Sequence, residues 1–548
     1  MIEIDKVLEK CGDFHRYQFM LLFLFCIINL LSSVQYYSQT IISFIPEHWC
    51  YHELLLELNV TEIRRIYEGI ENPSCVSYDN VMLGDRQNES ETEIIINKRS
   101  CTKFIYNYDF GYHSMTTELN WVCDLKWKTT VGQSMFFIGS VIGSLLFGIL
   151  ADKIGRLPVL ISANMVAMTG NLSTMFCSSF EFFCVCRFIA GMATDSNFVM
   201  MYILVMEYIR PSMRTAGLSL CIGIFYCIGS AVTPWIAVYV GDWRMFLLVT
   251  GIPFLTVPLS YFLVVESAQW LVTKCQYDKA VQCLKRVAKF NGVHVEDYIF
   301  EEFKINCTKS MANSTKEVNM LKLFKTPRLR RNTLILFFKS MVLTLCYDAI
   351  SRNVEGLGIS PFIMFSLSAS AIFPACIVLI LLQDKIGRKA MASSSLLMSG
   401  VFTAASGLII LYGKSINGKS DVILVTTLAI IGRFGVTVAY NSGAQYATEL
   451  IPTCVRGQGV AAVHVAGFAF TFLSSYIIYL SQPFPALILG VLSLFGAGLC
   501  LLLPETLNRT LPCTLEAAEE FGRGENIFQF SCFENRTNRT TSTDNLGC

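Results

Sequence analysis

Twelve long apolar runs constrain this chain more than any other feature of its sequence. A helix needs about 20 mostly apolar residues to cross the ~30 Å hydrocarbon core of a bilayer, and each run is long enough to do so. Apolar and polar residues do not alternate within the runs, which disfavours a transmembrane β-barrel. We therefore predict an all-α membrane protein with twelve transmembrane helices. The runs lie at residues 19–43, 131–151, 157–178, 180–206, 215–240, 245–265, 332–351, 358–383, 390–412, 421–446, 457–481 and 484–503.

The charge content excludes most soluble classes of protein. Charged residues make up 16% of the 548 residues and hydrophobic residues 53%, whereas soluble proteins carry about a quarter charged residues. The net charge is only +1, so no basic excess indicates a nucleic-acid partner. We expect the partners to be the lipid bilayer and a small solute. The sequence contains no nucleotide-binding loop, zinc-protease motif or hydrolase elbow, so we predict neither an enzyme nor a bound cofactor or metal.

Basic residues in the short loops predict the orientation. Lys and Arg favour the cytosolic side of a membrane. The short loops on the same side of the membrane as the N-terminus hold eight of them, and the short loops on the opposite side hold four. The first run lacks a small-residue cleavage site and is too long for a signal peptide, so we expect a retained helix. The prediction is a multi-pass plasma-membrane protein with both termini in the cytosol.

Two long polar segments divide the chain. The predicted parts are a cytosolic N-terminal tail, a six-helix bundle that includes a large extracellular loop, a cytosolic central loop, a second six-helix bundle and a cytosolic C-terminal tail. Their boundaries are residues 1–18, 19–265 (with the loop at 45–128), 266–331, 332–503 and 504–548.

The extracellular loop carries cysteines and glycosylation sequons. Its environment is oxidising, so disulfides and sugars are expected there. Four cysteines allow three pairings, and the sequence does not choose among them. The disulfide candidates are Cys50, Cys75, Cys101 and Cys123, and the sequons begin at Asn59 and Asn88.

An internal repeat relates the two bundles. The sequence Asp-Lys-Ile-Gly-Arg at 152–156 recurs unchanged at 384–388. The segment 207–214 has an echo at 449–456, and the pair Arg187-Phe188 has one at Arg433-Phe434. These residues fall at cytosolic helix ends, where we expect ion pairs that latch the two halves in one state. The predicted latch residues are Gly148, Asp152, Gly155, Arg156, Glu207, Arg214, Asp384, Gly387, Arg388, Glu449 and Arg456.

The motifs resemble those of a transporter family. Gly-x-x-x-Asp-x-x-Gly-Arg at 148–156, its partial copy at 384–388 and the six-plus-six layout are similar to the major facilitator superfamily. The large loop, Thr117–Asp124, Glu266–Leu271 and Pro504–Leu507 resemble the organic cation, anion and zwitterion transporters within it. The resemblance implies two pseudo-symmetric six-helix bundles around a central cavity and alternating access. The family's usual Pro-Glu-Ser-Pro-Arg-Trp-Leu is Val-Glu-Ser-Ala-Gln-Trp-Leu here, at 265–271.

Ionisable residues inside the apolar runs are the first candidates for substrate binding, because each costs roughly 2.5–3.5 kcal/mol to insert at mid-membrane. Asp195 either attracts a cation or is bonded to a neighbour such as Ser196. Asp348 is either a second cation site or the partner of Arg352, four residues later. Lys339 binds a carboxylate or extends towards the cytosol. His464 either packs, senses pH or binds substrate.

Other candidates rest on the resemblance or on side-chain chemistry. The family places a charged residue of the eleventh helix where this chain has Phe468, so the simplest charge code is absent. Aromatic faces bind ammonium groups, and amides orient polar groups. These further candidates are Tyr347, Phe198, Tyr202 and Gln445.

The predicted function is transport of small organic cations or zwitterions, such as amine-, carnitine- or β-alanine-like solutes. Two acidic candidates against one Lys favour positive charge. An organic anion exchanger that uses Lys339 and His464 is one alternative. A membrane sensor that does not transport is another.

Overall fold

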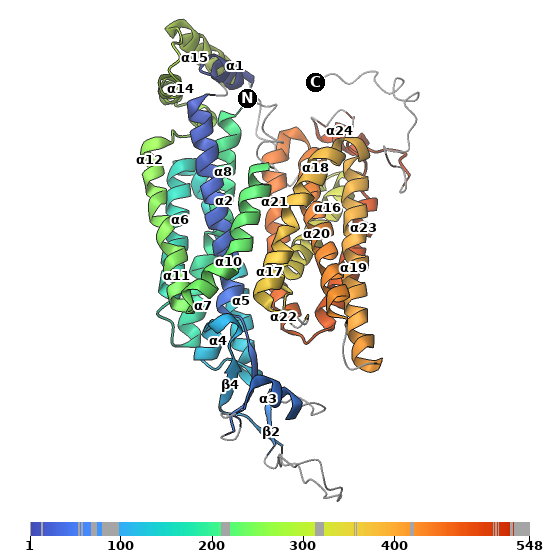
Figure 1. Ribbon diagram of the computed structural model, residues 1–548. Coiled ribbons are helices and arrows are strands. Elements are labelled where there is room, and N and C mark those ends of the chain that lie inside the picture. The colour runs from blue at the N-terminus through green and yellow to red at the C-terminus, as the bar shows by residue number, and fades with distance from the viewer. Residues whose placement is uncertain are drawn as a thin grey trace, which may run out of the picture.

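The computed structural model describes most of the chain, and its transmembrane part is helical (Figure 1). The described residues are all except 1, 13–14, 53–54, 56–57, 67–73, 79–97, 210–219, 313–322, 356, 358, 417–420, 508, 510–511, 513, 527–529 and 531–548. Within them, eleven helices or helix pairs are long and apolar enough to cross a membrane. The third predicted run forms α6 (Arg156–Thr174), which is not among the eleven. Its Asn, Ser and Thr side chains lower its hydropathy, yet it packs against α7 and α8.

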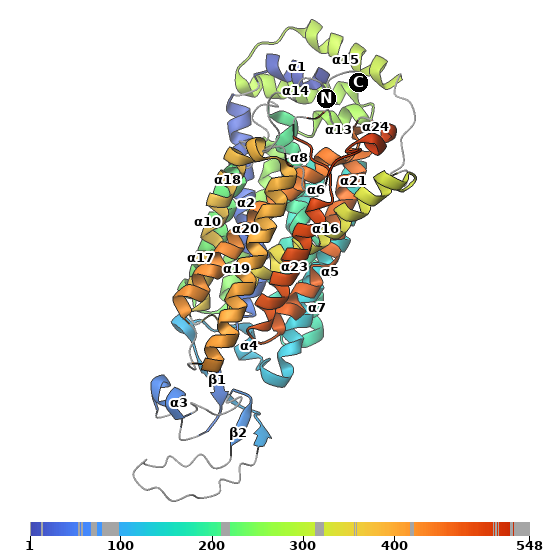
Figure 2. The ribbon, with the colours of Figure 1, turned by 90° about the vertical axis from the view of Figure 1, so that its right-hand side faces the viewer.

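The helices form two groups that lie side by side (Figures 1 and 2). Each group has its own large core, and the two cores share no residues. The first group comprises α2 (Arg16–Ile42), α5 (Lys126–Ile154), α6, α7 (Phe180–Met192), α8 (Thr194–Tyr208), η4 (Ile222–Tyr226), α10 (Cys227–Val240), α11 (Trp243–Gly251), η5 (Ile252–Leu259) and α12 (Ser260–Leu263). The second comprises α16 (Pro327–Arg352), α17 (Pro361–Ser370), α18 (Ile372–Ile386), α19 (Arg388–Ile416), α20 (Val422–Leu450), α21 (Arg456–Ala469), α22 (Phe472–Tyr479) and α23 (Phe484–Leu501). We call them the N-terminal and C-terminal halves.

Short helices cover one end of the molecule, which we call the cap end (Figure 1). They are α1 (Ile2–Lys10), α13 (Ala268–Thr273), α14 (Tyr277–Asn291), α15 (Asp297–Ala312) and α24 (Leu515–Glu520). The Asn291 amide ties this cap to the N-terminal half, because it accepts from the Tyr17 backbone N–H at 2.8 Å and donates to the carbonyls of Cys11 and Gly12. On the C-terminal half, the Glu519 carboxylate accepts the N–H groups of Arg328 and Leu329 at the start of α16.

The opposite end carries the large loop, and we call it the loop end. The loop contains β1 (Glu47–Cys50), α3 (Val60–Ile66), β2 (Val76–Tyr78), β3 (Lys98–Ser100), β4 (Phe104–Asn107), η2 (Asp109–Gly111), α4 (Met115–Glu118) and η3 (Cys123–Leu125). Strand β1 pairs antiparallel with β4, and β2 with β3. Of the three pairings left open by the sequence, the structure joins Cys50 to Cys101 and Cys75 to Cys123.

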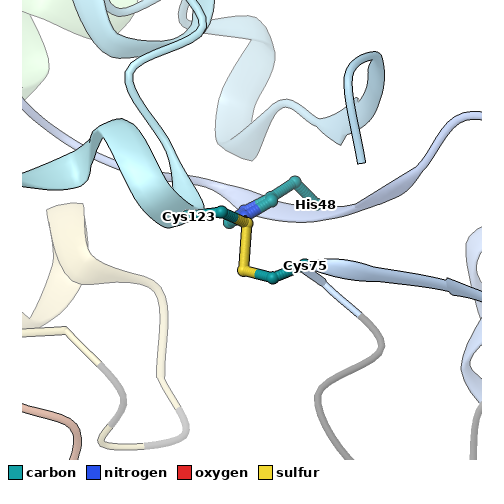
Figure 3. Close-up of side chains that lie close together, drawn as sticks. All are labelled: His48, Cys75 and Cys123. Atoms are coloured by element: carbon teal, nitrogen blue, oxygen red, sulfur yellow. A yellow bond between two sulfur atoms is a disulfide. The ribbon is translucent and has the colours of Figure 1, made fainter. Parts of the chain in front are cut away.

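His48 lies beside the second disulfide (Figure 3). Its Nε2 is 3.8 Å from the Cys123 sulfur, and with Cys75 the three side chains have the spacing of a metal site. Both sulfurs are in the disulfide, so neither is a thiolate free to bind a metal. Burial lowers the pKa of His48 below its ordinary value.

Candidate functional site

Aromatic rings from both halves meet a buried guanidinium at the boundary between the halves. The Tyr347 ring stacks on Tyr440 with 4.4 Å between centroids, and the Arg433 guanidinium lies 4.4 Å from the centroid of the Tyr347 ring. Arg433 donates to the Tyr347 carbonyl at 3.1 Å and to the Tyr37 hydroxyl at 3.2 Å. Tyr37 contacts the rings of Tyr226 and Phe365 edge to face. We call these six residues the central cluster: Tyr37, Tyr226, Tyr347, Phe365, Arg433 and Tyr440.

The central cluster draws on five elements. Tyr37 and Tyr226 come from α2 and η4 in the N-terminal half, and the others from α16, α17 and α20. η4 is a turn of π-helix, a local distortion that often marks a functional site. The cluster therefore joins segments that are more than 300 residues apart in sequence.

Asp195 lies in the first turn of α8 and is half-buried. Its carboxylate accepts a hydrogen bond from the Ser140 hydroxyl on α5. It also interacts electrostatically with the Tyr440 phenol across the boundary between the halves. The predicted partner Ser196 is not its partner among the described residues, because the Ser196 hydroxyl has none there. Asp195 of the N-terminal half is thus a neighbour of Tyr440, a central-cluster residue of the C-terminal half.

Asp348 is paired rather than free. It is fully buried and forms an ion pair with Arg352 one turn later, with Asp348–Arg352 contacts of 2.5 to 3.1 Å. The structure therefore favours the ion-pair alternative over a second cation site. The Tyr36 hydroxyl and the Ser474 hydroxyl also donate to this carboxylate.

Lys339 and His464 lie on helices of the C-terminal half, whereas Asp195 lies on α8 of the N-terminal half. Lys339 is 2% exposed, and its ammonium group donates to the Gly443 carbonyl of α20 at 2.8 Å within the C-terminal half. Its aromatic neighbour is Tyr446, at 5.8 Å. His464 is exposed on α21 and interacts electrostatically with Lys339. The two basic candidates are thus neighbours of each other, on helices of one half.

The remaining substrate-binding candidates do not gather at one place. Tyr202 packs against Phe25 in the core of the N-terminal half. Gln445 accepts from Gln383 at 2.7 Å and belongs to the cap end. Phe468 is half-buried on α21, whereas the side chain of Phe198 lies outside the described residues.

The predicted latch residues form two matching networks at the cap end. Arg156 pairs with Asp152 at 3.0 Å in the N-terminal half, and Arg388 pairs with Asp384 at 3.0 Å in the C-terminal half. Arg388 also contacts Glu449 at 3.1 Å. Each of these ion pairs lies within one half in this state.

A Glu at the end of each half completes its network. The Glu266 carboxylate accepts the Arg156 N–H at 2.9 Å, and Glu505 accepts the Arg388 N–H at 2.9 Å. Beside them, Ser267 donates to Glu207 and Thr506 donates to Glu449. Sequence reasoning missed the roles of Glu266 and Glu505. The shared pattern Glu-Ser/Thr after the sixth and twelfth runs is the signal that identifies them.

The other latch residues differ from a simple Glu–Arg pair. Arg456 donates from Nε to the Ile451 carbonyl at 3.3 Å, while Glu449 is occupied by Arg388. Gly155 and Gly387 have φ of +109° and +103°, so they make the turns between helices. Gly148 lies inside α5 with open space around it. Arg214 and the sequon residue Asn88 lie outside the described residues, and Asn59 is exposed in the loop.

Comparison with known proteins identifies the family. A family model described as "Sugar (and other) transporter" matches residues 95–515. The chain belongs to the sugar (and other) transporter family. It is therefore a membrane transporter rather than an enzyme.

Within this family, its relatives confirm the predicted resemblance to organic ion transporters. It is 27% identical to the organic cation transporter protein of Drosophila melanogaster, over 95% of each chain. It is 29% identical to the organic cation/carnitine transporter 2 of Homo sapiens, over 94% of this chain and 93% of that one.

Solved structures confirm the major facilitator fold. The proton:xylose symporter of that superfamily superposes with a TM-score of 0.56 at 15% identity, covering 91% of this chain and 99% of that chain. An inward-open structure of the xylose transporter from E. coli gives the same score and coverage. The predicted fold of two six-helix bundles is thus confirmed.

Proposed function

We propose that this transporter carries small organic cations or zwitterions across the plasma membrane by alternating access. The observation that supports this most is Asp195, whose partner in the described part of the chain is a hydroxyl and not a basic group. A half-buried carboxylate without a counter-ion is costly in a membrane and marks a site for a cationic ligand. The named activities of the relatives agree with this choice.

The physical gain from such a site is large enough for selectivity. A substrate ammonium about 4 Å from a carboxylate gains about 4 kcal/mol at an effective dielectric constant of about 20. Each ring face of the central cluster adds roughly 0.5–2 kcal/mol. Tyr440, one of the two stacked rings, interacts electrostatically with Asp195.

Arg433 favours zwitterions among these solutes. In the described residues the Arg433 guanidinium donates to a carbonyl and a phenol, and its buried Nε has no partner. A substrate carboxylate would supply the missing counter-charge. Arg433 contacts the ring of Tyr347, and Asp195 interacts with Tyr440, the ring stacked on it. A solute with its ammonium and carboxylate several bonds apart suits this arrangement.

The anion-exchange alternative has less support. Lys339 is directed to the Gly443 carbonyl inside the C-terminal half, and it does not join the central cluster. The charged group that interacts electrostatically with His464 is Lys339, in the same half. A negative solute at the central cluster would meet the Asp195 carboxylate.

We further propose that the loop end is extracellular and that both termini are cytosolic. The two disulfides and the exposed sequon residue Asn59 suit an oxidising, glycosylating compartment. At about −60 mV, inward movement of one positive charge gains roughly 1.4 kcal/mol, which gives about tenfold accumulation. We also propose that the two cap-end networks hold their helices together while the halves move.

Uptake into cells tests the substrate class. Cells that express the chain are given labelled carnitine, a small aromatic amine, β-alanine and an aromatic carboxylate, with Asp195→Asn compared with the wild type. Asp297→Asn is the matched control, since Asp297 is an exposed acid of the cap end that pairs with Lys285. We expect cation or zwitterion uptake to fall at least tenfold in Asp195→Asn and to persist in Asp297→Asn. Uptake of the carboxylate alone would favour the anion exchanger. Ligand-induced stabilisation without any uptake would favour the sensor.

A further inference from the structure

Polar contacts between the two halves concentrate at the end of α16 nearest the loop. Asp348 and Arg352 lie one turn apart there and are 0% and 2% exposed. The Ser474 hydroxyl of α22 sits against both, 2.6 Å from Arg352 and 2.5 Å from Asp348. These three residues of the C-terminal half form one compact, charged unit.

Two helices of the N-terminal half are bonded to this unit. The Tyr36 hydroxyl of α2 donates to the Asp348 carboxylate. The Gln133 side-chain oxygen of α5 accepts from Arg352 at 3.0 Å. The Arg352 guanidinium also lies 4.9 Å from the centre of the Phe137 ring. Both charges of the pair are therefore used to hold the opposite half.

The cap end lacks the equivalent. Among the described residues, every ion pair of the cap-end helices joins residues of the same half or its caps. Further contacts across the boundary towards the loop end include Ser134 to the Phe472 carbonyl at 3.2 Å and Trp235 to Ser366 at 2.9 Å. The halves are thus fastened at the loop end in this state.

We propose that Asp348 and Arg352, with Tyr36 and Gln133, form the gate that closes the central cavity at the loop end. Asp348 and Arg352 act as positioning residues that do not touch the solute. The contacts to Tyr36 and Gln133 break before a solute passes between the cavity and the loop side. The gate rests on the transport cycle proposed above, but its test does not depend on solute identity.

The sequence spacing makes this gate reversible. Because Asp348 and Arg352 are four residues apart on one helix, their ion pair moves with the C-terminal half and stays intact when the halves separate. Opening then exchanges two hydrogen bonds and a ring contact for water, and it leaves no buried charge alone. An ion pair shared between the halves would instead leave a charge without its partner on each side.

Chemical labelling tests the gate. Asp195→Cys serves as a reporter within the cavity, and a membrane-impermeant thiol reagent is applied from the loop side of intact cells. Labelling of the wild-type chain gives the background from the native cysteines. Tyr36→Phe and Gln133→Ala, each added to the reporter, remove one cross-half bond and leave the ion pair in place. Glu118→Gln is the matched control, because Glu118 and Arg244 form a 2.6 Å loop-end ion pair confined to the N-terminal half.

We expect each gate variant to raise the labelling rate of the reporter about tenfold over the reporter alone, which corresponds to about 1.4 kcal/mol. Glu118→Gln is expected to leave the rate unchanged. Unchanged rates in both gate variants, or an equal rise in the control, would overturn the proposal. Since labelling needs no solute, a failed uptake experiment with a positive labelling result would refute the transport proposal and leave the gate standing.

Discussion

Gly155→Ala and Gly387→Ala test the cap-end networks most sharply. Gly155 has φ of +109° and ψ of 167°, a conformation that only glycine adopts readily, and other residues pay roughly 1–3 kcal/mol for it. A Cβ added there would lie 2.3 Å from Glu266 Oε2. That carboxylate would have to give up hydrogen bonds worth roughly 1.5–3 kcal/mol. The sum is about 2.5–6 kcal/mol, a large part of a typical stability of about 5–15 kcal/mol.

The same loss is expected at Gly387, where an added Cβ would lie 2.3 Å from Glu505 Oε2. Gly148→Ala is the matched control, since nothing lies within 4 Å of its added Cβ. Inside a helix this change should be neutral or stabilise by about 0.5–1 kcal/mol. Thermal unfolding in detergent, followed by size-exclusion chromatography, measures all three variants. If Gly155→Ala and Gly387→Ala were as stable as Gly148→Ala, the reasoning would be wrong.

Three further predictions concern single interactions. The hydrogen bond from Arg244 holds the pKa of Glu118 below its usual 4.5. The pair therefore stabilises the fold above that pH, and this stabilisation is lost as the pH falls. The difference in melting temperature between wild type and Glu118→Gln should shrink below pH 4.5. Losing the Cys50–Cys101 link, which spans 51 residues, should cost about 4 kcal/mol by chain entropy; peptide mapping of the oxidised chain should recover this pair, and recovery of another pairing contradicts the structure. Lys339→Met removes a buried charge that is bonded only to a carbonyl in the described residues, so it should raise the melting temperature and leave uptake affinity within twofold; a large loss of affinity would return Lys339 to the binding site.

Short-range patterns predicted much of the architecture. The repeat of Asp-Lys-Ile-Gly-Arg predicted two equivalent turns, because each Gly permits the positive φ at which one helix ends and the next begins. The spacing of four residues within one helix predicted the contact between Asp348 and Arg352. Hydropathy located α6 as well, although its polar side chains weaken the signal.

Contacts across the molecule could not be predicted in this way. Tyr36 and Gln133 reach the Asp348–Arg352 pair from helices more than 200 residues away in sequence, and only the docking of the halves brings them there. The direction of Lys339 towards Gly443 depends on how α16 packs on α20. Hydropathy places such a residue in the membrane but does not say which neighbour it faces.

The most direct test of the account is uptake by the purified protein in liposomes. The chain is reconstituted, an inside-negative potential of about −60 mV is imposed with a potassium gradient, and a labelled quaternary ammonium or carnitine-like zwitterion is supplied. We predict saturable uptake that Asp195→Asn reduces at least tenfold, with a cation accumulating about tenfold at this potential. Uptake no greater than that of empty liposomes across the panel, or uptake indifferent to Asp195, would contradict it.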